Sequence, residues 1–237
     1  MRSEPAIPLI EFRNVRKVFG TGKARFEALK GIDFTINEGE FVAIMGTSGS
    51  GKSTTMNIIG TLDRPSSGEY LFNGHHVEAL NADQRALLRR YYLGFVFQGF
   101  NLLARTSAIE NVELPLIYRG VGRQERLERS MAALERVGLA QWAKHTPAEL
   151  SGGQQQRVAI ARAIVCQPKV LLADEPTGSL DSARSVEIME LLQDLNRNEG
   201  ISVVLVTHEP DMAQYASRHM VFKDGLLIRD DHGGNTP

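Results

Sequence analysis

The residues with the clearest capacity for chemistry form one glycine-rich stretch, Gly46-Thr47-Ser48-Gly49-Ser50-Gly51-Lys52-Ser53, with Thr54 directly after it. The apolar run before the stretch predicts a buried strand, and the residues after it predict the start of a helix. In such a loop the backbone N–H groups surround an anion, and the helix dipole favours negative charge. We therefore expect the stretch and Thr54 to bind nucleotide phosphates. Lys52 would reach the β- and γ-phosphates, and Ser53 would bind Mg²⁺.

Other polar residues follow apolar runs that are typical of buried strands, namely Gln98, the pair Asp174 and Glu175, and His208. Strands that alternate with helices indicate a mostly parallel sheet, and ligands gather at the carboxyl ends of its strands. We therefore expect these side chains to converge with the glycine-rich loop. The simpler alternative for that loop is a Gly/Ser turn with a surface lysine.

Each of these side chains has a chemical role that fits its type. Asp174 would bind Mg²⁺ through the water shell of the ion, and Glu175 would orient and deprotonate the attacking water. Gln98 would touch both the metal and that water through its neutral amide, and His208 would donate a hydrogen bond to the γ-phosphate. The alternatives are a helix cap and a surface acid for the two carboxylates, and a structural histidine for His208.

A second motif, Leu150-Ser151-Gly152-Gly153-Gln154-Gln155-Gln156-Arg157, stands at the start of a predicted helix. A serine and two glycines at a helix N-terminus form another anion site. One nucleotide has a single γ-phosphate, so a second anion site on the same chain calls for an explanation. The interpretation most consistent with these residues is that the second site serves another copy of the chain.

The composition sets outer limits on the fold and on the partners. The chain has 237 residues, a net charge of −1 and one cysteine, Cys166. This length is enough for a large α/β domain, and the balanced charge argues against a dedicated nucleic-acid binder. A single cysteine forms no disulfide within the chain, and it is expected as a small core residue on a helix. We find no stretch apolar enough to cross a bilayer, so any membrane part is expected on another chain or outside this sequence.

Pattern and turn residues predict the remaining elements. Strands are expected at 9–15 and 28–36 with a polar turn at 16–23, a hairpin at Asn73-Gly74, a helix at 83–92 and a closing hairpin at Asp224-Gly225. One helix is expected to bury Leu127, Met131, Leu134 and Val137. Another is expected to begin at a Ser182 cap and to bury Val186, Met189, Leu192 and Leu195. His75 and His76 are expected at the surface.

In their order along the chain these motifs resemble those of the ATP-binding cassette ATPases, from about residue 9 to residue 228. Leu150-Ser151-Gly152-Gly153-Gln154 is similar to the family signature, and residues 46–53 and 170–174 are similar to its Walker A and Walker B motifs. Ser179-Leu180-Asp181 resembles the D-loop, Gln98 the Q-loop, Glu175 the catalytic glutamate and His208 the switch histidine.

The resemblance implies a fold, cofactors and an assembly. The expected fold is α/β, a P-loop NTPase (RecA-like) core with an N-terminal antiparallel β subdomain and an inserted α-helical subdomain. As a single domain it would comprise a core at about 9–92 and 166–228, a helical part at about 99–165 and a mobile tail at 232–237. In this family two cassettes pack head to tail around two ATP molecules with Mg²⁺. Ser151, Gly153 and Gln154 would then bind the nucleotide held by the other copy.

Phe19 matches the position of the aromatic residue that stacks on adenine in this family. Phenylalanine keeps the stacking face of the tyrosine that is often found there. A plain core role for Phe19 is the alternative.

A closer resemblance is to the cassettes of MacB-type transporters. It lies in residues 44–53 and 56–63, in the run Leu93-Gly94-Phe95-Val96-Phe97-Gln98, in Asn101-Leu102-Leu103 and in Glu110-Asn111-Val112, and this group is similar to the lipoprotein-release ATPase. It implies an ATPase at the cytoplasmic side of the bacterial inner membrane, peripheral to it and paired with an integral membrane permease. Phe100, Leu102, Leu103 and Leu114 would contact that permease, or would be buried in the helical part instead. The competing functions are a soluble cassette ATPase acting on nucleic acid or ribosomes, and a cell-division regulator of cassette type.

Overall fold

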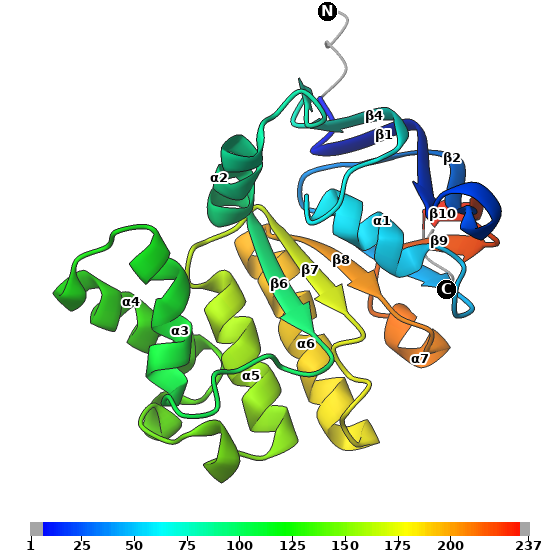
Figure 1. Ribbon diagram of the computed structural model, residues 1–237. Helices are drawn as coiled ribbons and strands as arrows, with labels where there is room; N and C mark the ends of the chain where they lie inside the picture. The colour runs from blue at the N-terminus through cyan, green and yellow to red at the C-terminus, as the bar shows by residue number, and fades with distance from the viewer. Residues whose placement is uncertain (1–6, 233–237) are drawn as a thin grey trace, which may run out of the picture. The chain divides into compact units, whose positions relative to one another are not determined.

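The structure, a computed structural model, describes residues 7–232 and divides into two compact units (Figure 1). The first unit takes residues 1–87 and 204–237, and the second takes residues 88–203. Only two elements span the division along the chain among the described residues: α2 (Ala82–Tyr92) and β8 (Ser202–Val206).

An antiparallel sheet in the order β2-β1-β4-β5 forms one part of the first unit. Its strands are β1 (Ile10–Phe19), β2 (Phe26–Ile36), β4 (Ser67–Phe72) and β5 (His75–His76). The predicted hairpin between β4 and β5 is confirmed, because Asn73 and Gly74 both have positive φ, 49° and 76°, as a tight two-residue turn requires. The rings of Phe12, Phe34 and Tyr70 pack as tilted pairs on the buried face of this sheet.

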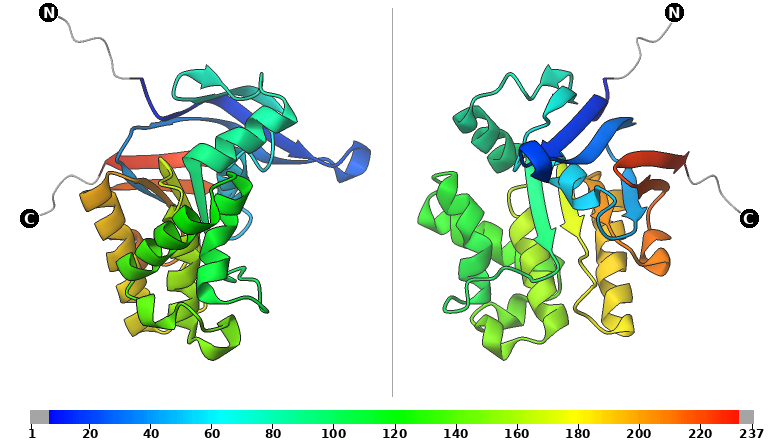
Figure 2. Two further views of the ribbon diagram at one scale, coloured as in Figure 1. Left: turned by 90° about the vertical axis from the view of Figure 1, so that its left-hand side faces the viewer. Right: turned by 45° about the vertical axis from the view of Figure 1, so that its right-hand side comes forward.

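Strand β1 is longer than the sequence pattern predicts, and this corrects the turn expected at 16–23. Arg16, Lys17 and Phe19 pair with Lys30, Leu29 and Phe26 of β2 across a ladder with register shifts, and Ser66 N donates to the Arg16 carbonyl on the other side. Backbone pairing on both edges therefore overrides the polar composition. The short turn that remains contains the 3-10 helix η1 (Gly22–Ala24) and projects beyond the sheet (Figure 2).

The rest of the first unit surrounds the glycine-rich loop. Strand β3 (Phe41–Gly46) pairs in parallel with β9 (Arg218–Lys223), which forms the predicted hairpin with β10 (Leu226–His232). Helix α1 (Lys52–Ile59) follows the loop, and α7 (Pro210–Ala213) is a single turn. Arg218, the first residue of β9, is buried and forms ion pairs with Asp230 of β10 and with Glu40 just before β3. The ion pair with Glu40 connects the start of β9 to the start of β3.

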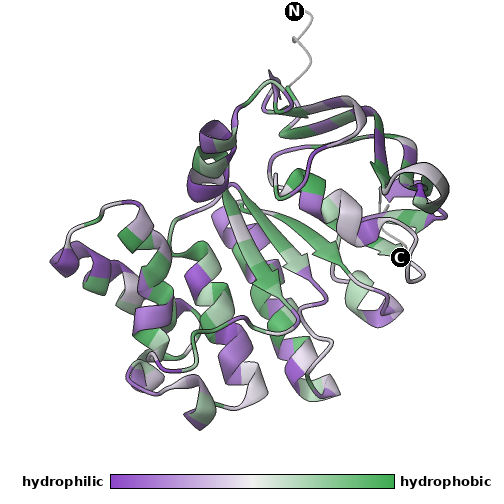
Figure 3. Ribbon diagram, in the orientation of Figure 1, coloured by the Kyte–Doolittle hydropathy of each residue, from purple (hydrophilic) through white to green (hydrophobic). Residues whose placement is uncertain are grey.

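The second unit combines two parallel strands with a set of helices. Strand β6 (Leu93–Phe97) pairs with β7 (Val170–Asp174), and both are strongly apolar (Figure 3). Helix α5 (Gly152–Ile164) packs on β6 and against α6 (Ser182–Glu199), α3 (Ala108–Tyr118) and α4 (Arg123–Arg136). The 3-10 helices η2 (Ala140–Trp142) and η3 (Pro147–Glu149) connect α4 to α5.

Two helix predictions need correction. Asp181, rather than Ser182, caps α6, because its carboxylate accepts a hydrogen bond from the Arg184 N–H at 3.0 Å. Val186 on that helix is 38% exposed and Leu127 on α4 is 46% exposed, so neither belongs to the predicted core face, whereas the remaining members of each face are not exposed. Cys166 is buried, as expected, but it lies in the turn after α5 rather than on a helix, and burial raises the pKa of its thiol.

The division into core and helical subdomain stays a prediction, although all helices between residues 108 and 164 lie in the second unit. Of the predicted mobile tail, residue 232 is the last residue of β10, and 233–237 lie outside the described residues. Within the described part of the chain, no helix has both the length and the apolar composition that a bilayer-spanning segment needs.

Candidate functional site

The glycine-rich loop lies between the end of β3 and the start of α1, as predicted. Gly46, Gly49 and Gly51 have positive φ angles of 146°, 77° and 107°. Gly51 is also the N-cap of α1, and no side chain caps that helix. The N-terminus of α1 therefore presents backbone N–H groups, with the positive end of the helix dipole, toward the loop.

Two of these glycines leave little room for a side chain: at Gly46 a Cβ would collide with strand backbone, and at Gly51 it would be crowded by β2. A Cβ on Gly46 would lie 2.2 Å from the carbonyl oxygen of Phe222, and one on Gly51 would lie 3.0 Å from that of Ala28. By contrast, a Cβ on Gly49 meets nothing within 4 Å. The loop thus follows the strands closely at both ends and is open in the middle.

Lys52 and Ser50 give the loop the character of an anion site. The Lys52 side chain is 7% exposed, and its ammonium donates to the carbonyls of Gly46 and Thr47 at 2.8 and 3.0 Å. The Ser50 hydroxyl is buried and has no hydrogen-bond partner among the described residues. A confined cation, an orphaned hydroxyl and an uncapped helix N-terminus are the donors that bound phosphates require, so this loop fits a nucleotide. Thr47, Ser48 and Ser53 are exposed beside it, and Thr54 is half-buried.

Phe19 lies near the tip of the β1–β2 hairpin and is 43% exposed, so the alternative of a core role does not hold. The ammonium of Lys17 lies 4.8 Å from the centre of its ring. An exposed aromatic face beside a cation suits a flat heterocycle, and the adenine role stays a prediction. His208, also in the first unit, is exposed two residues after β8, where Thr207 N donates to the carbonyl of Ile44.

In the second unit the parallel register of β6 and β7 brings Gln98 and the two carboxylates to one edge. Phe97 is opposite Asp174, so Gln98 and Glu175 leave the two strands side by side. The amide nitrogen of Gln98 lies close to Gly178, where a Cβ would come within 2.8 Å. Asp174 and Glu175 are both partly exposed, and because Asp181 caps α6, neither carboxylate caps that helix.

Glu175 also has a feature that the sequence did not reveal: its φ is 44°. A non-glycine residue in the left-handed region carries strain, and such residues cluster at functional sites. The loop after β7 therefore holds the backbone of Glu175 in a conformation that is unfavourable for a residue with a side chain.

The second motif begins α5 with a capping box. The Gln154 N–H donates to the Ser151 hydroxyl at 3.3 Å, and the Gln154 side chain accepts from the Ser151 N–H at 2.8 Å. Ser151 is exposed, and its hydroxyl proton remains available for an anion in front of the helix. Gly152 and Gly153 fit closely against Leu180 and Arg184, because a Cβ on either would lie 3.3 and 2.9 Å from them. This packing joins the motif to the segment that resembles a D-loop.

Two residues that hold the segment after Gln98 were missed as functional residues by sequence reasoning. Asn111 of α3 is fully buried, and its amide bonds Leu103, Thr106 and Ser107. Arg162 of α5 donates to two carbonyls of the same segment. Only Asn111 had a signal, in the run 110–112 that carried the resemblance. Nothing in the local pattern distinguished Arg162 from other helix arginines.

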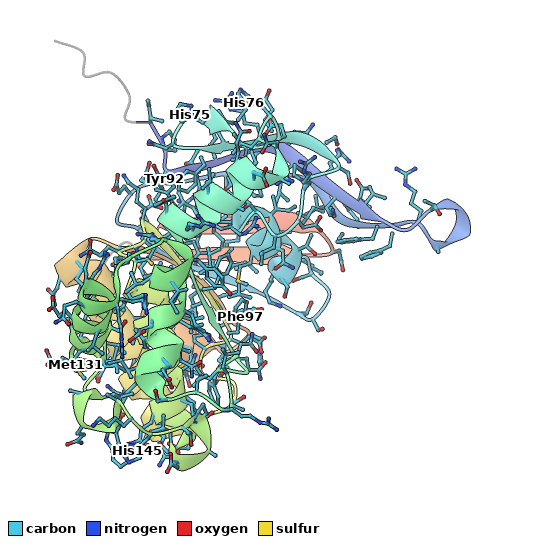
Figure 4. All side chains as sticks on the ribbon, turned by 60° about the vertical axis from the view of Figure 1, so that its left-hand side comes forward. His75, His76, Tyr92, Phe97, Met131 and His145 are labelled. Carbon is cyan, nitrogen blue, oxygen red and sulfur yellow. The ribbon has the colours of Figure 1, made fainter. Side chains whose placement is uncertain are left out.

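The histidine pair on β5 has the surface position that was predicted. Both side chains are exposed at the edge of the four-stranded sheet (Figure 4), and His76 Nδ1 lies 2.8 Å from a Glu78 carboxylate oxygen. Among the described residues no three His, Cys, Asp or Glu side chains gather as a metal site. The predicted Mg²⁺ ligands are one hydroxyl, one amide and one carboxylate, which is the hard-oxygen set that Mg²⁺ accepts together with phosphates and waters.

The structure thus places the phosphate loop, Phe19 and His208 in the first unit, and Gln98, Asp174, Glu175 and the residues Ser151, Gly153 and Gln154 in the second. Convergence of the two groups on one nucleotide stays a prediction.

The fold and these motifs define a P-loop ATPase cassette, and comparison with known proteins agrees. A family model described as ABC transporter matches residues 29–178. The chain therefore belongs to the ABC transporter family, and its class is that of the ABC-type ATPases.

Individual relatives cover nearly all of the chain. The macrolide export ATP-binding/permease protein MacB of Syntrophobacter fumaroxidans is 52% identical over 92% of this chain and 31% of its own length. The pyoverdine export ATP-binding/permease protein PvdT of Pseudomonas aeruginosa is 51% identical over 98% of this chain and 35% of its own length. The ABC transporter ATP-binding protein YknY of Bacillus subtilis is 52% identical, over 95% of this chain and 97% of its own length. The chain thus spans about a third of the two ATP-binding/permease relatives.

Among solved structures, the ATP-binding cassette MJ0796, in a dimeric post-hydrolysis state with ADP and Pi, is similar with a TM-score of 0.87. It is 44% identical, over 95% of this chain and 99% of that one. The predicted fold class is confirmed by this match.

Proposed function

We propose that this chain is the ATP-hydrolysing subunit of a MacB-type transporter, in which two copies close head to tail around two ATP molecules and drive a membrane partner. The relatives named as ATP-binding/permease proteins support the partner, and the dimeric cassette MJ0796 supports the assembly. The permease would be a separate chain, or a part of this polypeptide outside the sequence. The proposed place is the cytoplasmic side of the bacterial inner membrane, peripheral to it.

The observation that carries the proposal is the presence of two anion sites on one chain. The loop around Lys52 has its cation, its uncapped helix and its orphaned hydroxyl within the first unit. The exposed N-terminus of α5 at Ser151 is a separate site in the second unit. In a head-to-tail pair each γ-phosphate meets one site from each copy, so both sites are used.

The roles of the site residues follow from their chemistry. Mg²⁺ would be held by Ser53, Gln98 and, through water, Asp174, and would neutralise charge on the phosphates. Glu175 accepts the proton of the attacking water, and Gln98 orients that water. His208 donates a hydrogen bond to the γ-phosphate. Residues 46–54 bind the phosphates from one copy, Ser151, Gly153 and Gln154 bind them from the other, and Phe19 stacks on adenine.

The surface that would meet the permease is the segment after Gln98 together with α3. Phe100, Leu102 and Leu114 are only partly covered, and Leu103 is 49% exposed. Each of the four therefore keeps some apolar surface that a partner could cover, and Leu103 keeps the most. Partly exposed apolar side chains of this kind suit a partner helix.

The test is the substitution Glu175→Gln, which keeps the shape of the side chain and removes the base. Turnover is expected to fall at least about 100-fold, because general base catalysis contributes that much or more. ATP binding is expected to remain, and the variant should form a dimer with ATP but not with ADP, measured by light scattering. Glu125→Gln, which changes an exposed glutamate on α4, is the matched control.

Wild-type turnover by Glu175→Gln would remove this residue from the mechanism. A variant that binds ATP and stays monomeric at every concentration would contradict the head-to-tail assembly.

The membrane partner is tested with the same ATP-trapped variant, tagged and used as bait on detergent-solubilised membranes of the source organism. Recovery of an integral membrane permease, lost when Leu103→Asp is added to the bait, supports the proposal. Recovery of ribosomes or DNA instead would favour a soluble cassette ATPase.

A further inference from the structure

The segment directly after Gln98 has an unusual backbone. Phe100 and Asn101 are consecutive non-glycine residues with positive φ, 59° and 50°. Two tight local hydrogen bonds accompany this turn, Phe100 N to the Phe97 carbonyl and Asn101 N to the Gly99 carbonyl. Left-handed backbone at two successive side-chain-bearing residues is strained and persists only where other contacts hold it.

Arg162 supplies the contact that holds this turn. One Nη of its guanidinium donates to the Phe100 carbonyl at 2.9 Å, and the other donates to the Asn101 carbonyl at 2.6 Å. A planar fork of donors is suited to two adjacent carbonyls in a way that a lysine ammonium is not. Arg162 is half-buried, and desolvation of the guanidinium lowers its pKa, so the two carbonyls replace part of its water.

The same turn also touches the beginning of α5. A Cβ on Gly152 would lie 3.8 Å from the Cζ atom of Phe100, which places the ring beside the residue after Ser151. Arg162 lies ten residues further along the same helix. Its guanidinium bonds two carbonyls of the same turn, which fits the general tendency of helical side chains to lean toward the helix N-terminus. The segment after Gln98 thus contacts α5 at two places, Gly152 at its start and Arg162 near its end.

We infer that Arg162 is a positioning residue that fixes the turn after Gln98 to helix α5. The orientation of the Gln98 side chain then depends on the position of α5, whose N-cap is Ser151. A shift of α5, when Ser151 engages an anion, is carried through Arg162 and Phe100 to the backbone two residues from Gln98. The consequence for turnover rests on the proposed function, whereas the mechanical link does not.

The experiment compares wild-type protein with Arg162→Lys and Arg162→Gln, with Arg129→Lys as the matched control. Arg129 is an arginine on α4 that forms an exposed pair with Glu125. Hydrogen exchange is measured on nucleotide-free protein, for peptides covering residues 98–103, the phosphate loop and α5. Turnover, KM for ATP and its Mg²⁺ dependence are measured on the same samples.

In Arg162→Gln, exchange of residues 99–103 is expected to be about tenfold faster, while the phosphate loop and α5 keep their wild-type rates. The value of kcat should fall about 10- to 100-fold, with KM for ATP nearly unchanged and with more Mg²⁺ needed for half-maximal rate. Arg162→Lys should lie between wild type and Arg162→Gln, because an ammonium reaches one carbonyl well and not both. Arg129→Lys should match wild type.

Unchanged exchange at residues 99–103 in Arg162→Gln would overturn the inference. Faster exchange throughout α5, with kcat and ATP affinity falling together, would also overturn it, because Arg162 would then only stabilise the helix. The exchange measurement contains no nucleotide, so a failed Glu175→Gln test would leave it standing, and the two failures are distinguishable.

Discussion

Single glycines fix the backbone path of the phosphate loop. Gly46 passes so close to β9 that a Cβ would lie 2.2 Å from the Phe222 carbonyl oxygen, and its φ is 146°. Gly49 has a positive φ of 77° with open space around it. A side chain at Gly46 would therefore both collide with a neighbouring strand and strain the backbone, whereas a side chain at Gly49 would only strain the backbone.

Alanine at these two positions is predicted to have unequal effects on stability. Gly46→Ala combines strain with overpacking and should lower the free energy of unfolding by about 2–4 kcal/mol. Gly49→Ala meets only the left-handed penalty and should cost about 1–2 kcal/mol. Urea unfolding of nucleotide-free protein measures both. Equal costs for the two variants would mean that the strands around Gly46 give way more easily than their backbone contacts indicate.

The residues of the phosphate loop and its helix were predictable because their types and spacing are local. The positive φ of Glu175 and the two hydrogen bonds from the Arg162 guanidinium to backbone carbonyls were not predictable from the sequence. Arg162 contacts carbonyls 61 and 62 positions away in the chain, and a contact of that separation leaves no trace in a local pattern. Asn111 was noticed only as part of a matching run, without its role as the amide that holds residues 103–107.

At the scale of elements, three of the helices that the structure describes in the second unit begin with reciprocal caps. Ser107 with Glu110 begins α3, Thr146 with Glu149 begins η3, and Ser151 with Gln154 begins α5. Hydrogen bonds from Ser107 lower the pKa of Glu110 below its usual value, and Thr146 does the same for Glu149. The folded state therefore favours the ionised form of each carboxylate.

A pH dependence of stability follows for α3. Because the pKa of Glu110 is lower in the folded state than in the unfolded state, its contribution is complete above about pH 4.5. It is lost as the pH falls through the folded value. Glu110→Gln keeps an acceptor and removes the charge. The free energy of unfolding of this variant should therefore change less than that of wild type between about pH 5 and pH 3. Parallel curves for the two proteins over this range would exclude the cap as a source of acid sensitivity.

Element boundaries were predictable where a turn residue marks them and failed where pairing decides them. The hairpins at Asn73-Gly74 and Asp224-Gly225 are confirmed. The extension of β1 to Phe19 was missed, because the strand is polar there and its stability comes from backbone pairing with β2. The cap of α6 was placed one residue late, since Asp181 and Ser182 are both good caps and only the geometry at Arg184 chooses between them.

For the whole molecule, the fold class and the family follow from the order of the motifs, and both are confirmed by the comparisons. The arrangement of the complete site could not be predicted in the same way. Its two groups of residues lie in separate compact units, and its proposed second half comes from another copy. The spacing of residues along one chain predicts neither the distribution of the site over two units nor the contribution of a second copy.

The central claim is that each ATP is enclosed by the phosphate loop of one copy and Ser151 of another. The most direct measurement mixes two variants in a Glu175→Gln, Cys166→Ala background, one carrying Ser48→Cys and the other Ser151→Cys, with a short thiol cross-linker. We predict a covalent dimer that needs both variants and ATP and is absent with ADP. A covalent dimer that forms equally well from either variant alone, or no dimer in saturating ATP, would contradict the account.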